Sequence, residues 1–155
     1  MSAISMTNSA PAEPIKAYAT LRVTGDRLDP EQVTRLLKIV PTLAYAKGEL
    51  YSGGSRSPDL IGRTGVWYFC TDGIVAGTRL ADHFAFLLRQ VAAAPAFQQL
   101  LKRKALDVVV TAFWHGPAKA KQPPIPRALA DRLKRIPARI EMDFDHDGAD
   151  DRHAA

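Results

Sequence analysis

The stretch LRVTGDRLDPEQVTRLLK, residues 21–38, takes the chain from a strand into a helix and sets the start of the fold. Apolar and polar residues alternate over residues 17–24, which is typical of a half-buried strand. Asp29 then occupies an N-cap position, and Pro30 follows it where its missing N–H is not needed. The pattern therefore predicts a strand over residues 17–24 and a helix over residues 30–38.

The strand period of two residues and the helix period of 3.6 residues predict the remaining elements outside this stretch. A weaker strand is expected over residues 42–51, and further strands over residues 65–71, 106–114 and 138–144. Helices are expected from near Thr78, from Pro95 and from Pro126. We therefore expect a two-layer α+β fold with a ferredoxin-like βαββαβ core, an added C-terminal αβ unit and a mostly antiparallel sheet.

The periodicities also predict where single side chains point. Ile140, Met142 and Phe144 are expected to face inward from the last strand. His83 lies opposite the apolar stripe of the long helix and is expected at the surface. Cys70, in a central strand, is expected to pack as a small core residue.

The domain organisation follows from the ends of this pattern. Residues 1–16 are rich in Ser, Ala and Pro, and we interpret them as a disordered lead-in. They lack the apolar core of a secretory signal, so a cytoplasmic location is expected. Residues 17–145 are then a single α+β domain, and residues 146–155 are an acidic flexible tail.

The charges are unevenly distributed along the chain. The 155 residues carry 21 Lys and Arg against 16 Asp and Glu, a net charge of +5. Residues 141–151 hold six of the carboxylates and no Lys or Arg, so residues 1–140, with 20 basic and 10 acidic residues, carry +10. No stretch has the roughly 18 consecutive apolar residues of a membrane span. A single cysteine also excludes a disulfide scaffold.

Several segments together resemble one bacterial family. They are LRVTGDRLDPEQVTRLLKIVPTLAYAKGE over residues 21–49, GRTGVW over residues 62–67, a long helix with paired leucines, and Asp143-Phe144-Asp145. In this order they resemble domain of unknown function 4279, over about residues 18–145. The resemblance implies a compact α+β domain and supplies no reaction, cofactor or catalytic residue. Residues 38–40 lack the glycine expected to close the first helix, so a geometry other than the left-handed αL stop is expected there.

The C-terminal aspartates imitate part of a calcium loop. Asp143, Asp145, Asp147 and Gly148 match its positions 1, 3, 5 and 6. Position 12 is Ala154, where a bidentate Glu is needed, and no helix flanks the segment. We therefore predict no metal site and no cofactor, and these aspartates are only weak candidates.

Two groups of residues are candidates for binding. Arg63, Trp67 and His115 are interpreted as lining a ligand pocket near the sheet, because such pockets combine aromatic walls with a few polar groups. The candidates for binding an anion or a partner are Arg56, in the loop over residues 52–63, and Arg127, Arg132 and Arg135 on the last helix.

The sequence favours a small non-enzymatic protein-interaction module, immunity-like or regulatory, with an acidic protein partner. The alternative is a small-ligand-binding protein or an enzyme with a pocket near Trp67 and His115. No catalytic residue is identified, and whether the protein is an enzyme stays open with a leaning to no. A further alternative is nucleic-acid binding through basic helix faces, with Tyr18, Trp67 and Trp114 stacking on bases. The lack of a recognised nucleic-acid motif disfavours it, and no membrane partner is expected.

Overall fold

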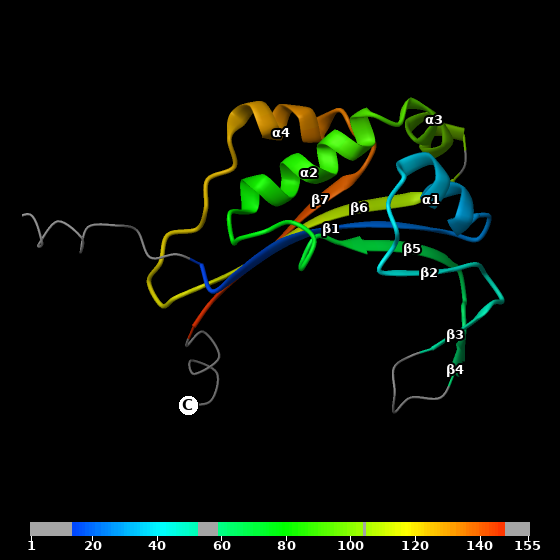
Figure 1. Ribbon diagram of the computed structural model, residues 1–155, viewed down its shortest axis with the longest axis horizontal. Coiled ribbons are helices and arrows are strands. Elements are labelled where there is room, and N and C mark those ends of the chain that lie inside the picture. Colours follow the sequence, from blue (N-terminus) through cyan, green and yellow to red (C-terminus); the bar gives the residue numbers. More distant parts are fainter. Residues whose placement is uncertain (1–13, 53–58, 104, 148–155) are drawn as a thin grey trace, which may run out of the picture.

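The computed structural model describes residues 14–52, 59–103 and 105–147 (Figure 1). Its strands are β1 (Lys16–Gly25), β2 (Leu43–Tyr45), β3 (Leu50–Ser52), β4 (Asp59–Ile61), β5 (Gly65–Cys70), β6 (Asp107–Gly116) and β7 (Arg139–His146). Its helices are α1 (Pro30–Leu37), α2 (Leu80–Ala92), α3 (Pro95–Arg103) and α4 (Arg127–Lys134). These helices lie together on one face of the main sheet and leave its other face open (Figure 1).

The main sheet of the described residues has five strands in the order β2-β5-β1-β6-β7. Neighbouring strands are antiparallel except β6 and β7, which run parallel and are joined through α4. β3 and β4 form a separate two-stranded hairpin. The expected mixed α+β fold with a mostly antiparallel sheet is thus confirmed.

Local sequence signals explain how α1 begins and ends. The Asp29 side chain accepts hydrogen bonds from the N–H groups of Glu31 and Gln32 at 3.2 and 3.4 Å. At the other end, Lys38 takes a φ of 56° and donates its N–H to the Thr34 carbonyl. The expectation of another geometry is therefore wrong, because the lysine itself adopts the left-handed conformation that glycine usually supplies.

The hydrophobic core lies between the main sheet and the helices. Trp67 of β5 is fully buried there, and its indole N–H donates to Thr34 Oγ1 of α1 at 3.0 Å. Other large side chains with almost no exposure are Phe84, Phe97, Leu21 and Leu37. Because alternate residues of a strand point to opposite faces, the remaining residues of β1, β5 and β6 line the open face.

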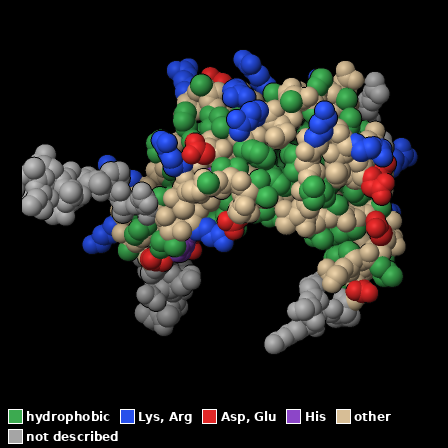
Figure 2. All heavy atoms as spheres, in the orientation of Figure 1, with side chains coloured by type: hydrophobic (Ala, Val, Ile, Leu, Met, Phe, Trp, Pro, Cys, Tyr) green, Lys and Arg blue, Asp and Glu red, His purple; other side chains and the backbone are tan. Residues whose placement is uncertain are grey.

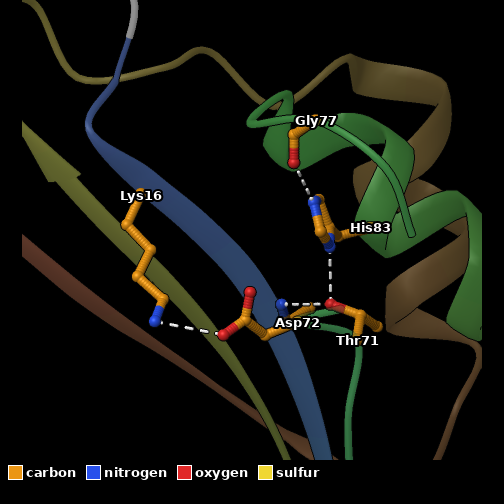
Figure 3. A network of polar contacts seen from close by, with 6 residues as sticks. Lys16, Thr71, Asp72, Gly77 and His83 are labelled. Atoms are coloured by element: carbon orange, nitrogen blue, oxygen red, sulfur yellow. Dashed lines mark hydrogen bonds and ion pairs between the residues drawn. The ribbon is translucent and has the colours of Figure 1, made fainter. Parts of the chain in front are cut away.

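His83 of α2 is buried in this core, so the expectation of a surface position is wrong. Its Nδ1 lies 2.6 Å from Thr71 Oγ1, and its Nε2 lies 2.9 Å from the Gly77 carbonyl oxygen (Figure 3). Thr71 Oγ1 also accepts the N–H of Ala19 in β1 at 2.9 Å. Burial of the imidazole is tolerated because both ring nitrogens have partners, which the apolar period of the helix does not reveal.

The segment expected to be one strand over residues 42–51 instead contains the separate strands β2 and β3. Gly48 lies between them with a φ of 82°, and its N–H bonds to the Gly62 carbonyl at 2.8 Å. A glycine at positive φ turns the chain out of the sheet, so β3 pairs with β4 and not with β5. β4 itself lies in the segment expected to be a loop.

β7 is an edge strand, because β6 is its only neighbour among the described strands. Ile140 and Phe144 are half-buried and pack against the core. Met142 lies between them and is 49% exposed, so the expectation that it faces the core is wrong. At the edge of the sheet the helices cover the strand only in part, and regular alternation does not guarantee burial there.

The two ends of the chain are described only in part. Residues 1–13 and 148–155 lie outside the described residues, so the expected lead-in and tail stay predictions. β7 extends through His146, whose Nε2 lies 2.7 Å from the Ala120 carbonyl oxygen. Among the described helices, none combines the length and the apolar character needed to cross a bilayer.

Candidate functional site

α4 turns an apolar side to the fold and a basic side to solvent. Leu129 and Leu133, four residues apart, are buried in the core. The solvent side of α4 exposes one carboxylate, Asp131, and four cations, which we call the α4 basic surface: Arg127, Arg132, Lys134 and Arg135. Figure 2 shows that Lys and Arg side chains gather over the helix side of the molecule.

A pocket of about 160 Å³ adjoins Arg132 and Arg135, between α2, α3 and α4. Its other lining residues are Leu88, Val91 and Ala92 of α2, Gln98 of α3, and Ile136 just after α4. The Gln98 amide already donates to the Val91 carbonyl at 3.1 Å, so the pocket floor is largely apolar. Its volume is close to the roughly 150 Å³ of a cavity that accepts benzene, which leaves room for one apolar side chain.

The arginines beside this pocket have no carboxylate partner among the described residues. Within the described ranges, ion pairs of Lys and Arg join Lys16 to Asp72, Lys47 to Asp26, and Arg139 to Asp107 and Glu141. None of these pairs involves α4, and Arg132 and Arg135 form no ion pair with the part of the chain that the structure describes. Their charge therefore stays available to an anionic group from outside the molecule.

The model of the family described as domain of unknown function (DUF4279) matches residues 14–147. The chain belongs to the DUF4279 family. The match covers most of the chain and confirms the resemblance seen in its sequence. No curated protein and no solved structure matches it.

The DUF4279 domain does not bring Arg63, Trp67 and His115 together. Trp67 lies opposite Val23 of β1 and faces the helices, whereas His115 lies opposite Lys16, seven residues away and on the other face. Seven residues of strand span about 23 Å. Arg63 follows β4 and lines a separate open hollow beside the hairpin. The described residues thus do not form the pocket expected from these three side chains.

Two of the three weak metal candidates contact a histidine. His115 Nε2 lies 2.7 Å from Asp147 Oδ1, and its Nδ1 lies 3.8 Å from Asp145 Oδ2. Asp143 is exposed on the same strand, β7. Among the described residues, no group of three or more His, Cys, Asp or Glu could hold a metal ion. Gly148 of the imitated calcium loop lies outside them.

The remaining sequence candidates give little support to nucleic-acid binding. Arg56 lies outside the described residues. Trp67 and Trp114 are 0% and 2% exposed, so they cannot stack on bases. Tyr18 is half-buried and stacks on Phe113, with ring centroids 4.6 Å apart. The basic helix faces therefore lack the tryptophan platform that this alternative required.

The open sheet face holds residues that the sequence pattern did not single out. Thr20 and Arg22 of β1, Tyr68 of β5 and Thr111 of β6 line a hollow there. Burial is the main cause that raises the pKa of Tyr68 to about 12. Cys70 lies on this face too, half-buried, so its expected place in the core is wrong. The polar alternation of β1 was a visible signal, but alternation alone does not show that helices cover only one face.

Proposed function

We propose that this DUF4279 domain is a protein-interaction module, immunity-like or regulatory, that binds an acidic segment of a partner protein at the α4 basic surface. The observation that carries the proposal is the pocket, where Arg132 and Arg135 flank an apolar floor. Guanidinium groups recognise carboxylates through paired hydrogen bonds. An apolar pocket takes a buried anchor side chain. A segment with one large apolar residue among acidic residues has both features.

The charge of the chain supports an acidic partner. Residues 1–140 carry +10, and the whole chain carries +5. A field of that sign attracts an acidic protein and speeds the encounter. Exposed ion pairs contribute little to affinity one by one, so the anchor in the pocket sets the strength of binding and the arginines set its specificity.

The proposal includes two finer points. A ferredoxin-like core of β1, α1, β2, β5, α2 and β6 is supported by the strand order β2-β5-β1-β6 with antiparallel neighbours, and α4 and β7 are then the added unit. A cytoplasmic location is supported by the lone cysteine, which a reducing compartment keeps as a thiol.

Fluorescence anisotropy with a labelled acidic peptide tests the interaction. The peptide carries one leucine among glutamates, and its matched control carries serine in place of leucine. We expect Arg132→Glu/Arg135→Glu to weaken binding at least about tenfold, because two attractions of roughly 0.5 kcal/mol each become repulsions of similar size. The charge-matched variant Arg35→Glu/Arg79→Glu reverses two exposed arginines outside α4 and is expected to keep most of the affinity.

Three outcomes would contradict the proposal. Equal losses in the two double variants would mean that only net charge matters. Equal binding of the leucine and serine peptides would mean that the pocket takes no anchor. A single-stranded oligonucleotide that binds more tightly than the peptide, with a steep salt dependence, would point to nucleic-acid binding instead.

A further inference from the structure

The open sheet face contains a second candidate site, separate from the α4 basic surface. Figure 2 shows the molecule hollowed on the side away from the helices. Two cavities of about 130 and 490 Å³ lie on this face, and Arg22 and Tyr68 line both. Because they share these walls, we treat them as one site, the Arg22 trough. The larger cavity is within the roughly 300–1,000 Å³ of small-molecule sites.

Strand register explains why these side chains converge. Arg22 of β1 lies opposite Tyr68 on one side and Val109 on the other. Leu43 lies beyond Tyr68, and Arg139 lies beyond Val109. One row of five side chains therefore crosses the whole sheet on its open face, with Arg22 in the middle.

Arg22 carries the one charge without an ion-pair partner among the described residues that line the trough. Its side chain is exposed and forms no ion pair with them. Arg139 lies 2.9 Å from Asp107 and 3.7 Å from Glu141, so its charge is already offset. The centre of the trough thus presents a single free guanidinium, whose planar fork matches a carboxylate.

The walls around this guanidinium are apolar and phenolic. Leu43 is 40% exposed, and Val66, Tyr45 and Tyr68 line the same cavity. Burial raises the pKa of the Tyr45 and Tyr68 phenols, whereas the positive charge of nearby Arg22 lowers the pKa of each by a smaller amount. Both rings are therefore neutral at physiological pH, and a flat apolar group can cover them without meeting a second charge.

We propose that the Arg22 trough binds a monocarboxylate with a flat apolar body. The carboxylate pairs with the Arg22 guanidinium, and the body lies over Tyr68 and Leu43 toward the larger cavity. Thr20 and Thr111, which line the smaller cavity, offer hydroxyl donors next to the carboxylate. A second negative charge on the ligand would face Glu141, so the trough favours a monoanion over a dianionic phosphate.

Isothermal titration calorimetry with cinnamate tests this assignment. Cinnamamide keeps the flat body without the charge, and phenyl phosphate supplies a dianion. We expect cinnamate to bind at least about tenfold more tightly than either, because cinnamamide gains no charge-assisted hydrogen bond to the guanidinium and phenyl phosphate brings a second negative charge toward Glu141. Arg22→Gln is expected to lower cinnamate affinity to that of cinnamamide, and Arg35→Gln, an exposed arginine on α1, is the matched control that leaves it unchanged.

A second variant probes the wall independently of the charge. Leu43→Ala removes an exposed side chain and is expected to weaken cinnamate and cinnamamide by the same factor. No binding of cinnamate at millimolar concentration, equal binding of acid and amide, or tighter binding of phenyl phosphate would each overturn the assignment. Full retention of affinity in Arg22→Gln would place any bound cinnamate elsewhere, and would overturn it as well.

Discussion

Replacement of Thr71 by valine is expected to destabilise the fold far more than its size suggests. Thr71 lies directly after β5 and is 0% exposed. The Gly77 carbonyl can only accept, which assigns the proton of a neutral His83 ring to Nε2 and leaves Nδ1 as an acceptor. The Thr71 hydroxyl therefore donates to Nδ1 and at the same time accepts the Ala19 N–H. One hydroxyl thus ties β1, the end of β5 and α2 together (Figure 3).

The magnitude follows from the partners that valine would leave behind. Valine has nearly the shape of threonine, so Thr71→Val does not create a cavity. It leaves two buried groups without partners, the Ala19 N–H and the His83 Nδ1. Each unsatisfied group costs about 1–3 kcal/mol, so we expect a loss of about 2–6 kcal/mol in the free energy of unfolding. Against a typical total of roughly 5–15 kcal/mol, that is a large fraction.

Urea unfolding followed by circular dichroism measures this loss. Thr71→Ser is the control, because it keeps the hydroxyl and removes only a methyl group, which we expect to cost about 1 kcal/mol. A double-mutant cycle with His83→Leu then separates the Thr71–His83 bond from the Ala19 bond. If Thr71→Val costs no more than Thr71→Ser, the hydroxyl does not hold the three elements together and the reasoning is refuted.

Two further predictions concern single residues. Burial raises the pKa of Tyr68 to about 12 in the folded state, above the ordinary value near 10. The unfolded chain therefore loses the phenolic proton at a lower pH than the folded chain does. The free energy of unfolding should consequently fall as the pH rises between these two values. An ultraviolet titration should show a late phenolate step that Tyr68→Phe removes, and the loss of a step near pH 10 in Tyr68→Phe, with the late step unchanged, would refute this. Lys38→Gly should stabilise the fold by about 0.5–1 kcal/mol, because relief of left-handed strain outweighs the entropy of glycine. Thermal unfolding measures it, and a lower midpoint would contradict it.

Features set by near neighbours in the chain were predictable, and features set by distant ones were not. Asp29 and Pro30 define the start of α1 through contacts within three residues, and the structure has them as expected. His83 was misplaced because its partners, Thr71 and Gly77, come from the connection between β5 and α2. The periodic spacing of apolar residues shows which side of a helix is hydrophobic. It does not show whether a polar residue on the other side has a hydrogen-bond partner elsewhere in the fold.

The candidate sites show the same division. The exposure of Arg132 and Arg135 could be predicted from the helical period of α4. Their pocket could not, because α2 and α3 supply most of its lining. The expected pocket of Trp67 and His115 failed for a related reason, since residues on strands of one sheet share a site only when register and face both agree.

The two free edges of the main sheet have a consequence for how copies of this protein meet. A strand edge offers unpaired backbone groups to any other strand, which is a route to aggregation. The edge strand β2 is only three residues long. The other edge strand, β7, has charged residues at alternate positions, namely Arg139, Glu141, Asp143 and Asp145. A second β7 laid alongside in register would set carboxylate against carboxylate. Both edges of the sheet therefore disfavour strand pairing between molecules, which would extend the sheet into an aggregate.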